Sequence, residues 1–394
     1  MNERKKAAIL TVTDTNYGDF LQALGLKEFI SNIDGYDADI LKVRPKSNAL
    51  LCYKNMLRDK GLKWFILKGL KIITHEHVQS DFRNKMFETE YEHILTGTYT
   101  ESKKFPAAND LYDIFISGSA FTWCDHKSNM NAIKFFFLSG IKKPKISYAP
   151  SIGGGANFNK HLVKNIVPLL NEYDNISVRE TAGIKFLHKI LGNDRAVFHA
   201  IDPTLLLSSD DWDNIIDKNE TKFLYKNKEY IFVYLLGFSQ EQRELVKRFA
   251  KSKNLEIITF PHLYFNIESD NNFADIDIFD ATPYEMLLYI KNAKYIFTDS
   301  FHCSIFSGIF HKEFFVFNRI NQAVDNYEKA FMPRIDDLLD LYGVHNRYIP
   351  KYDIDISELD KIKSDWNALE ENLGVRRSEC QEWLKNALNS AAKI

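Results

Sequence analysis

Short runs of apolar, β-type residues alternate with segments of helical length along almost the whole chain, and this alternation restricts the fold more than any other feature. Parallel strands need long crossover connections, usually helices, so strand and helix alternate in sequence wherever helices cover a parallel sheet. The pattern therefore predicts an α/β protein. Because 394 residues exceed the usual size of one domain, we expect two doubly wound, Rossmann-type halves.

The predicted elements fall into two groups along the chain. In the first group, strands are expected at residues 7–13, 38–43, 114–117, 145–148, 176–178 and 197–199, with helices at 20–31, 160–172 and 181–191. In the second group, strands are expected at residues 230–235, 256–260, 295–298 and 314–317, with helices at 240–251, 283–292 and 301–310.

The domain boundaries follow from this grouping. We predict a first domain at residues 1–208, a polar and charged linker at 209–228, and a second domain at 229–350. Residues 351–394 have a helical pattern, and we expect this tail to pack back across both halves. Clefts between domains are favoured ligand sites, so functional residues are expected where the two halves face each other.

The charge balance argues against nucleic acid as a partner. The formal net charge is −2, which gives the chain no overall attraction to polyanions. The N-terminus is basic but lacks the apolar core and cleavage site of a signal peptide. No segment supplies the ~18 consecutive apolar residues of a membrane span. We therefore expect a cytoplasmic protein that makes at most peripheral contact with a membrane.

One apolar segment, KGLKWFILKGLKII at residues 60–73, carries interspersed lysines. It can be a helix packed on the sheet, with lysine stems lying over apolar surface, or a patch that rests on an anionic bilayer. The sequence leaves both interpretations open.

The four cysteines lie far apart and include no CxxC pair. Neither a zinc site nor a disulfide framework is therefore expected, and a reducing compartment fits this composition best. No other cluster of residues suggests a metal site.

The stretch YIFTDSFHCSIFSGIFHKEFFVF, residues 295–317, predicts a buried strand that leads directly into a buried helix. Asp299 and Ser300 end the strand and His302 begins the helix, which is where open α/β sheets bind ligands. Histidine is suited to moving protons near neutral pH. A single histidine in an apolar run is usually a packing residue, but the polar neighbours and the position favour a catalytic histidine that faces the cleft.

Two glycine-containing loops follow strands of the first half. In TDTNYGDFLQALGLKEF, Asn16, Tyr17 and Gly18 occupy the first strand-to-helix loop, where the N–H groups of a helix start can bind an anion. In APSIGGGANF, Gly153 and Gly154 begin a run of glycines that lacks the GK[ST] ending of a P-loop. Either loop can equally need its glycines for backbone geometry alone.

In NISVRETAGIKFL, Arg179 follows a short predicted strand and precedes a helix. The guanidinium fork at that position suits a carboxylate or a phosphate of a ligand. It can also form a structural pair with Glu180 or another acid, and the sequence leaves both roles open.

Several segments, in the same order, resemble the polysaccharide pyruvyl transferase family. NYGDFLQALGL resembles the family's NYG-x-x-LQAxxL opening, and YDIFISGSAFTW resembles its strand followed by GSDQxW. ISYAPSIG, ISVRE, DPTLLL, TDSFHCSIFSGIFHKEFFVF and PRIDDLLDLYGVHNR resemble later blocks of the family. The resemblance implies a GT-B-like architecture, with the acceptor on the first domain and the donor on the second.

The resemblance also implies a reaction, the transfer of a pyruvyl unit from phosphoenolpyruvate onto two hydroxyls of a surface-polysaccharide sugar or its lipid-linked repeat unit. The products would be a cyclic ketal and phosphate, with no cofactor or metal required. His302 would be the catalytic residue and Arg179 a donor ligand. We expect Ser300 and Arg319 to complete the donor site, with Arg334 and Lys312 as weaker candidates. The expected acceptor or loop contacts are Asn16, Tyr17, Gly18, Ser119, Gly153 and Gly154.

Departures from the family pattern leave alternatives open. Where relatives have GSDQxW, this chain has GSAFTW at residues 118–123, so an acid and an amide that could contact a sugar are missing. Ser300 stands where one branch of the family has arginine, and Cys303 where glycine is frequent. The alternatives are a GT-B glycosyltransferase that uses a nucleotide sugar and a non-catalytic sugar-binding relative.

Overall fold

The structure, a computed structural model, describes most of the chain. The predicted lysine-rich segment at 60–73 and Gly154 lie outside the described residues. The described ranges are 4–43, 77–99, 104–126, 129–153, 158, 160–262, 267–320 and 325–392.

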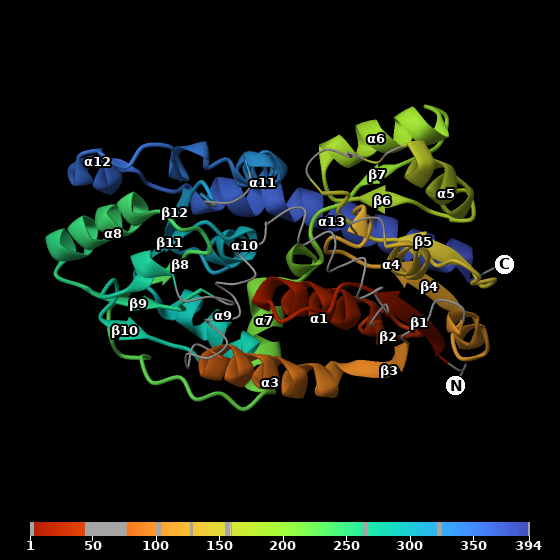
Figure 1. The fold of residues 1–394 in the computed structure, drawn as a ribbon, viewed down its shortest axis with the longest axis horizontal. Coiled ribbons are helices and arrows are strands. Elements are labelled where there is room, and N and C mark those ends of the chain that lie inside the picture. Colours follow the sequence, from red (N-terminus) through yellow and green to blue (C-terminus); the bar gives the residue numbers. More distant parts are fainter. Residues whose placement is uncertain are drawn as a thin grey trace, which may run out of the picture.

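A five-stranded parallel sheet forms the centre of the first half (Figure 1), in the order β3-β2-β1-β4-β5. Alternate residues of β1 face two different cores, because successive side chains of a strand point to opposite faces. Ala7 and Ile9 pack in the core that includes α1 (Tyr17–Ser31), whereas Ala8 and Leu10 pack in the core that includes α4 (Met130–Phe136). The strands are β1 (Lys5–Leu10), β2 (Tyr36–Val43), β3 (Leu95–Tyr99), β4 (Ile114–Ser117) and β5 (Lys145–Ser147).

A two-stranded parallel sheet lies beyond β5. It pairs β6 (Ser177–Val178) with β7 (Phe198–His199), and one isolated bridge, between Ile146 and Asn175, connects this region to β5. The helices α5 (Lys160–Leu170) and α6 (Thr181–Leu191) belong to the same region. This small sheet carries Arg179 at the end of β6.

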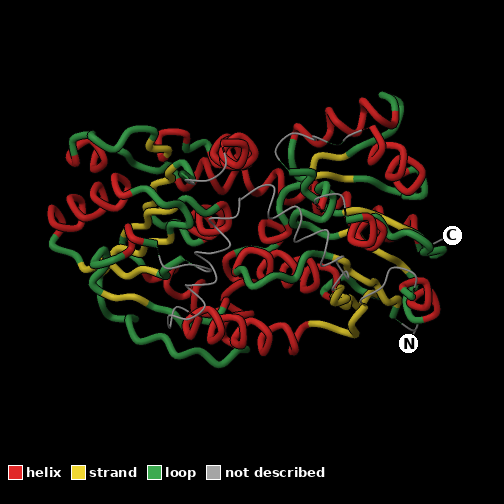
Figure 2. The backbone as a smooth tube through the Cα atoms, in the orientation of Figure 1, coloured by secondary structure: helices red, strands yellow, loops and turns green. Residues whose placement is uncertain are grey.

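A six-stranded parallel sheet forms the centre of the second half, in the order β10-β9-β8-β11-β12-β13. Helices lie on both sides of its strands (Figure 2), as expected for a doubly wound sheet. The strands are β8 (Tyr230–Tyr234), β9 (Glu256–Thr259), β10 (Ile276–Asp277), β11 (Tyr295–Thr298), β12 (Glu313–Phe317) and β13 (Tyr348–Ile349). The helices are α8 (Gln240–Lys253), α9 (Pro283–Asn292), α10 (Phe301–Ile309) and α11 (Asp325–Tyr342).

The predicted α/β class with parallel sheets is confirmed, and every strand expected from the sequence is present within a few residues. The structure adds elements that the sequence pattern did not reveal, namely β3, β10, β13, α3 (His77–Ile94), α4, α7 (Ser209–Asp217) and α11. Helix α7 begins the segment expected to be a polar linker. Its Trp212 is fully buried and packs edge-on against Phe306, with ring centroids 4.9 Å apart, so this part of the segment belongs to the core.

The C-terminal segment forms α12 (Ile356–Lys361) and α13 (Trp366–Ala391), and α13 (blue in Figure 1) runs from one half to the other. It contacts α11 in the second half, and β5 and the 3-10 helix η3 (Pro203–Leu206) in the first. Arg377 donates a hydrogen bond to the Leu205 carbonyl, 2.8 Å away. The predicted packing of the tail across both halves is thus confirmed. No helix of the described ranges is long and apolar enough to cross a membrane.

Candidate active site

The first turns of two helices from opposite halves, α1 and α10, meet at the candidate site. Gly18, in the first turn of α1, packs directly against His302 of α10. A Cβ atom added to Gly18 would lie 2.0 Å from His302 Nδ1, a distance that no real contact allows. A residue without a side chain is therefore required at this position for the imidazole to occupy its place.

Each of the two helix starts is capped by the residue before it. The Asn16 side chain accepts a hydrogen bond from the Gly18 N–H at 2.8 Å, and Ser300 Oγ accepts a longer one from the Cys303 N–H at 3.4 Å. Asn and Ser are favoured at this position because they satisfy N–H groups that have no partner within the helix.

His302 faces a carboxylate of the first half. Its Nε2 is buried and lies 3.5 Å from Asp202 Oδ2, and 14% of its side chain is exposed. Asp202 is held in place because its Oδ1 accepts hydrogen bonds from the Thr204 N–H at 3.1 Å and the Thr204 hydroxyl at 2.8 Å. Burial lowers the pKa of His302, and this outweighs the opposite effect of Asp202. The ring is therefore neutral at pH 7.

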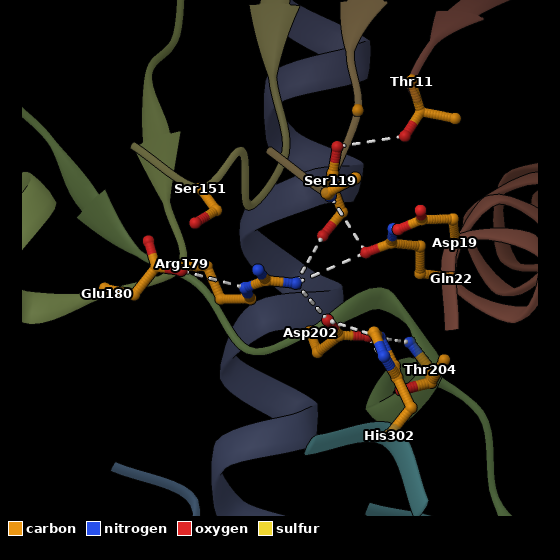
Figure 3. Close-up of polar contacts among 12 residues, drawn as sticks. Thr11, Asp19, Gln22, Ser119, Ser151, Arg179, Glu180, Asp202, Thr204 and His302 are labelled. Atoms are coloured by element: carbon orange, nitrogen blue, oxygen red, sulfur yellow. Dashed lines mark hydrogen bonds and ion pairs between the residues drawn. The ribbon is translucent and has the colours of Figure 1, made fainter. Parts of the chain in front are cut away.

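Arg179 lies at the centre of a buried network (Figure 3), between Glu180 on one side and Gln22 and Ser119 on the other. Its Nη1 is 2.7 Å from Asp202 Oδ2, and its Nε is 3.2 Å from Glu180 Oε1. Nη1 also donates to Gln22 Oε1 and Ser119 Oγ, both at 3.3 Å. The sequence left open a structural ion pair of Arg179 with Glu180 or another acid. The structure contains two such pairs, with Glu180 and with Asp202.

Asp202 joins this network to His302. Burial alone would raise the pKa of Asp202, but the proximity of His302 and Arg179, with the hydrogen bond from the Thr204 N–H, brings it well below its ordinary value. Asp202 is thus ionised at neutral pH. It lies between the guanidinium of the first half and the imidazole of the second.

A cavity of about 80 Å³ lies between the two helix starts. The first half contributes one wall and the second half contributes the other. The residues that line it are Asn16, Asp19, Gln22, Ala120, Phe121, Arg179, Leu236, Ser300, Phe301, His302, Arg319 and Arg334. Three arginines, one from the first half and two from the second, therefore share this cavity with His302.

A second cavity, of about 230 Å³, is also lined by Arg179. It shares Arg179, Phe301 and Arg334 with the first, but His302 is not part of its lining. His302 therefore lines the smaller cavity, although the larger one has more room.

Arg319 and Arg334 reach the His302 cavity from different elements. Arg319 follows β12 and donates through Nη2 to the Asp299 carbonyl at 3.0 Å. Arg334, on α11, lies over the rings of Phe121 and Phe301, at 4.6 Å and 5.6 Å from their centroids, in the geometry of a cation–π contact. Lys312, the other weaker candidate, is not part of the lining.

Asp299 is neither the N-cap residue of α10 nor the acid that faces His302. Its carboxylate accepts hydrogen bonds from the N–H groups of Leu236 and Gly237, at 2.8 Å and 2.7 Å, within its own half. Ser300 is the N-cap residue of α10, and Asp202 is the acid opposite His302.

The remaining predicted site residues are divided between the cavity and its surroundings. Asn16 and Ser300 line the cavity. Tyr17 is fully buried in the core between the halves, where its hydroxyl donates to the Ala281 carbonyl at 2.8 Å. Ser119 is buried beside Arg179, and Gly153 has a left-handed φ of 76° outside the cavity lining.

The sequence patterns did not identify Asp19, Gln22 and Asp202 as site residues. Asp202 precedes a proline in DPTLLL, a pattern typical of a helix N-cap, and Asp202 is indeed the N-cap residue of η3. Its contact with His302 joins residues far apart in sequence, and no local pattern encodes such a contact. For Asp19, burial raises the pKa most and Asp14 adds to this effect, while Arg179 and Arg334 oppose it; the resulting pKa is about 7.

Within the described part of the chain, no group of three or more His, Cys, Asp or Glu side chains is arranged to hold a metal ion.

The fold and the cleft site define a two-domain α/β protein of GT-B-like architecture. A UDP-N-acetylglucosamine 2-epimerase from Rickettsia bellii has the same fold, with 12% identity, a TM-score of 0.51, and coverage of 100% of this chain and 98% of that chain. The glycosyltransferase SnogD from Streptomyces nogalater is similar at 9% identity and a TM-score of 0.49, over 99% of this chain and 100% of that chain.

The sequence model of the polysaccharide pyruvyl transferase family matches residues 16–321, and the chain belongs to this family. The match spans both helix starts and the arginines at positions 179 and 319. No sequence among the curated proteins matches the chain significantly.

Proposed function

We propose that the protein transfers a pyruvyl group from phosphoenolpyruvate to two hydroxyls of a saccharide, forming a cyclic ketal and releasing phosphate. The observation that carries this proposal is a neutral His302 in a small cavity that also contains three arginines. Phosphoenolpyruvate has a carboxylate and a phosphate, and guanidinium forks bind both groups well.

The three arginines contribute differently to this electrostatic setting. Arg179 is paired with Asp202 and Glu180, so much of its charge is already balanced within the first half. Arg319 and Arg334 bring positive charge from the second half, where Arg319 Nε also lies 3.7 Å from Asp299 Oδ1. We propose that Arg319 and Arg334 attract the donor and that Arg179 fixes its orientation.

The reaction needs several proton transfers. Protonation of the methylene carbon C3 leaves positive charge at C2, which one sugar hydroxyl attacks; the second hydroxyl then replaces phosphate at C2. Each hydroxyl loses its proton during these steps. A neutral imidazole can accept such a proton, and Asp202, opposite Nε2, would stabilise the imidazolium that forms.

The size of the cavity favours this donor over a nucleotide sugar. About 80 Å³ is well below the ~300–1,000 Å³ of typical pockets for larger organic ligands. The acceptor is proposed to be a sugar of a surface polysaccharide or of its lipid-linked repeat unit, used in the cytoplasm or at the inner membrane face. The altered GSAFTW segment, whose Ala120 and Phe121 line the cavity, suggests that acceptor contacts differ from those of relatives with GSDQxW.

A thermal-shift comparison tests the donor. Phosphoenolpyruvate, UDP-glucose and free galactose are added separately, because a specific ligand raises the melting temperature by mass action. We expect stabilisation by phosphoenolpyruvate that is lost in Arg319→Ala, with mass spectrometry of a saccharide panel then identifying the ketal product. Stabilisation by UDP-glucose alone would overturn the proposal in favour of a glycosyltransferase.

A further inference from the structure

We propose that Asp19 is a second catalytic residue, which donates the proton to C3 of the donor while His302 accepts a proton from the acceptor hydroxyl. This inference rests on the proposed function and assigns a division of labour within the same site.

Asp19 and His302 line the same cavity from opposite halves. Asp19 directly follows Gly18, the residue that packs against the imidazole. The carboxyl group and the imidazole can therefore act on the same small ligand from opposite sides of the cavity.

One oxygen of Asp19 is held in place by Gln22. The Gln22 Oε1 accepts hydrogen bonds from the Ala120 N–H at 2.9 Å and from Arg179 Nη1 at 3.3 Å, so its amide nitrogen must point the other way. That nitrogen donates to Asp19 Oδ1 at 3.0 Å (Figure 3 shows these residues). Asp19 Oδ2 has no hydrogen-bond partner among the described residues, which leaves it for a ligand in the cavity.

Ala120, which fixes Gln22, has a left-handed backbone conformation with φ of 63°. This conformation is costly for a residue other than glycine and persists only where its surroundings enforce it. The hydrogen bond from Ala120 to Gln22 is one such constraint, so the GSAFTW loop contributes to the orientation of Asp19.

The environments of the two groups shift their proton affinities in opposite directions. Burial raises the pKa of Asp19 to about 7, so a large fraction of the carboxyl carries a proton near neutral pH. Burial lowers the pKa of His302, which keeps the ring free to accept one. Titratable groups whose pKa values are moved apart in this way mark the acid and the base of a site. The charged groups around Asp19 are Asp14, Arg179, Asp202 and Arg334.

The proton and electron balance of the reaction closes with these two residues. The C2–C3 double bond supplies the electron pair that binds the Asp19 proton at C3. A sugar hydroxyl then adds to C2 and gives its proton to His302. In the second stage the C2–O bond to phosphate breaks, His302 returns its proton to the leaving phosphate, and the second hydroxyl adds to C2 and reprotonates Asp19. Both residues end as they began.

Asp19→Asn tests the proposal, because asparagine keeps the oxygen that Gln22 binds but cannot supply the proton. Turnover is measured as phosphate release from phosphoenolpyruvate with a panel of p-nitrophenyl glycosides. We expect Asp19→Asn to bind phosphoenolpyruvate and to lose about 10²- to 10⁴-fold in rate, the usual contribution of acid–base catalysis. The wild-type rate should decrease above pH 7 as Asp19 ionises. Glu28→Gln, on the same helix, is the matched control and should behave as the wild type.

A second measurement does not depend on the acceptor. Calorimetric titration with phosphoenolpyruvate in buffers of different ionisation enthalpy reports the protons taken up on binding. An anion near Asp19 favours its protonated form, so uptake at pH 7 should be smaller in Asp19→Asn than in the wild type or Glu28→Gln. Unchanged uptake, or near-normal turnover in Asp19→Asn, would overturn the role of Asp19 alone. Absence of any phosphoenolpyruvate binding by the wild type would overturn the proposed function itself.

Discussion

The junction between β1 and α1 and the junction between β11 and α10 have the same local construction but different contents. In each, an extended residue, Asn16 or Ser300, caps the following helix with its side chain. The first junction then presents a glycine and an acid, Gly18 and Asp19, whereas the second presents an aromatic ring and an imidazole. The absence of a side chain in one half provides the space for the ring of the other. A complete site therefore exists only when both halves are in contact.

The largest effect should come from removing the imidazole. We expect His302→Ala to reduce turnover by about 10²- to 10⁴-fold while phosphoenolpyruvate still binds, because the arginines remain. Steady-state kinetics and calorimetry separate the two quantities. His311→Asn is the matched control, since His311 is well exposed and asparagine tolerates its left-handed backbone. Near-normal turnover in His302→Ala would show that the junction between β11 and α10 has no catalytic role.

Adding a methyl group to the first junction should have the next largest effect. In Gly18→Ala the new Cβ overlaps His302 Nδ1, so the ring or the whole helix must move. A displacement of about 1 Å can cost about 10² in rate, so we expect a loss of that order in kcat/KM. Gly374→Ala, in the interior of α13 with no atoms nearby, should leave activity unchanged and stabilise the protein by about 0.5–1 kcal/mol. If Gly18→Ala were as active as Gly374→Ala, the contact between the junctions would not matter for function.

Replacing the acid that connects the two halves should have a smaller effect, mainly on stability. Asp202→Asn removes a buried partner of Arg179, but Glu180 remains, so we expect the free energy of unfolding to fall by about 2 kcal/mol rather than the ~3–5 kcal/mol of a fully broken pair. Chemical denaturation measures this difference. The exposed carboxylate of Asp340, which pairs with His345, gives the control Asp340→Asn, with a change of about 1 kcal/mol or less.

Asp202→Asn should also change the pH profile. Asp202 raises the pKa of His302, so its replacement should lower that pKa further and move the acidic limb of the rate profile to lower pH. A purely structural role would leave the position of this limb unchanged.

The smallest effect should be seen in stability, through the contribution of His302 to its pH dependence. Its folded-state pKa lies below the ordinary value near 6.5, so the unfolded chain binds the proton more readily than the folded one. Stability from this group is complete above pH 6.5 and decreases as the pH falls below that value. We expect the melting temperature of the wild type to fall more steeply than that of His302→Gln below pH 6.5. Parallel curves would show that the imidazole is not buried in a neutral form.

Much of the fold could be predicted because buried parallel strands appear as continuous apolar runs. The elements that escaped prediction are short or mixed in composition: β10 and β13 have two residues each, and α7 is rich in acidic residues. Helix α7 is nevertheless part of the core, because Trp212, Ile215 and Ile216 are buried although the rest of the helix is mostly acidic.

A site residue could be predicted from the sequence only where it lies in a recognisable strand-to-helix junction. His302 and Arg179 satisfy that condition, and the structure brings both to one cavity. The partnership of His302 with Asp202, and the shared cavity of His302 and Asp19, depend on how the halves are placed. Such placement is a property of long-range packing, which the periodicity of a single sequence does not record.

The position of α13 has a consequence for the order in which the protein can form. This helix covers β5, contacts η3, and extends until Lys5 Nζ donates a hydrogen bond to the Ala392 carbonyl. During synthesis, β5 leaves the ribosome long before α13 exists. The first half therefore stays incompletely covered until α13 has been synthesised and has packed against it.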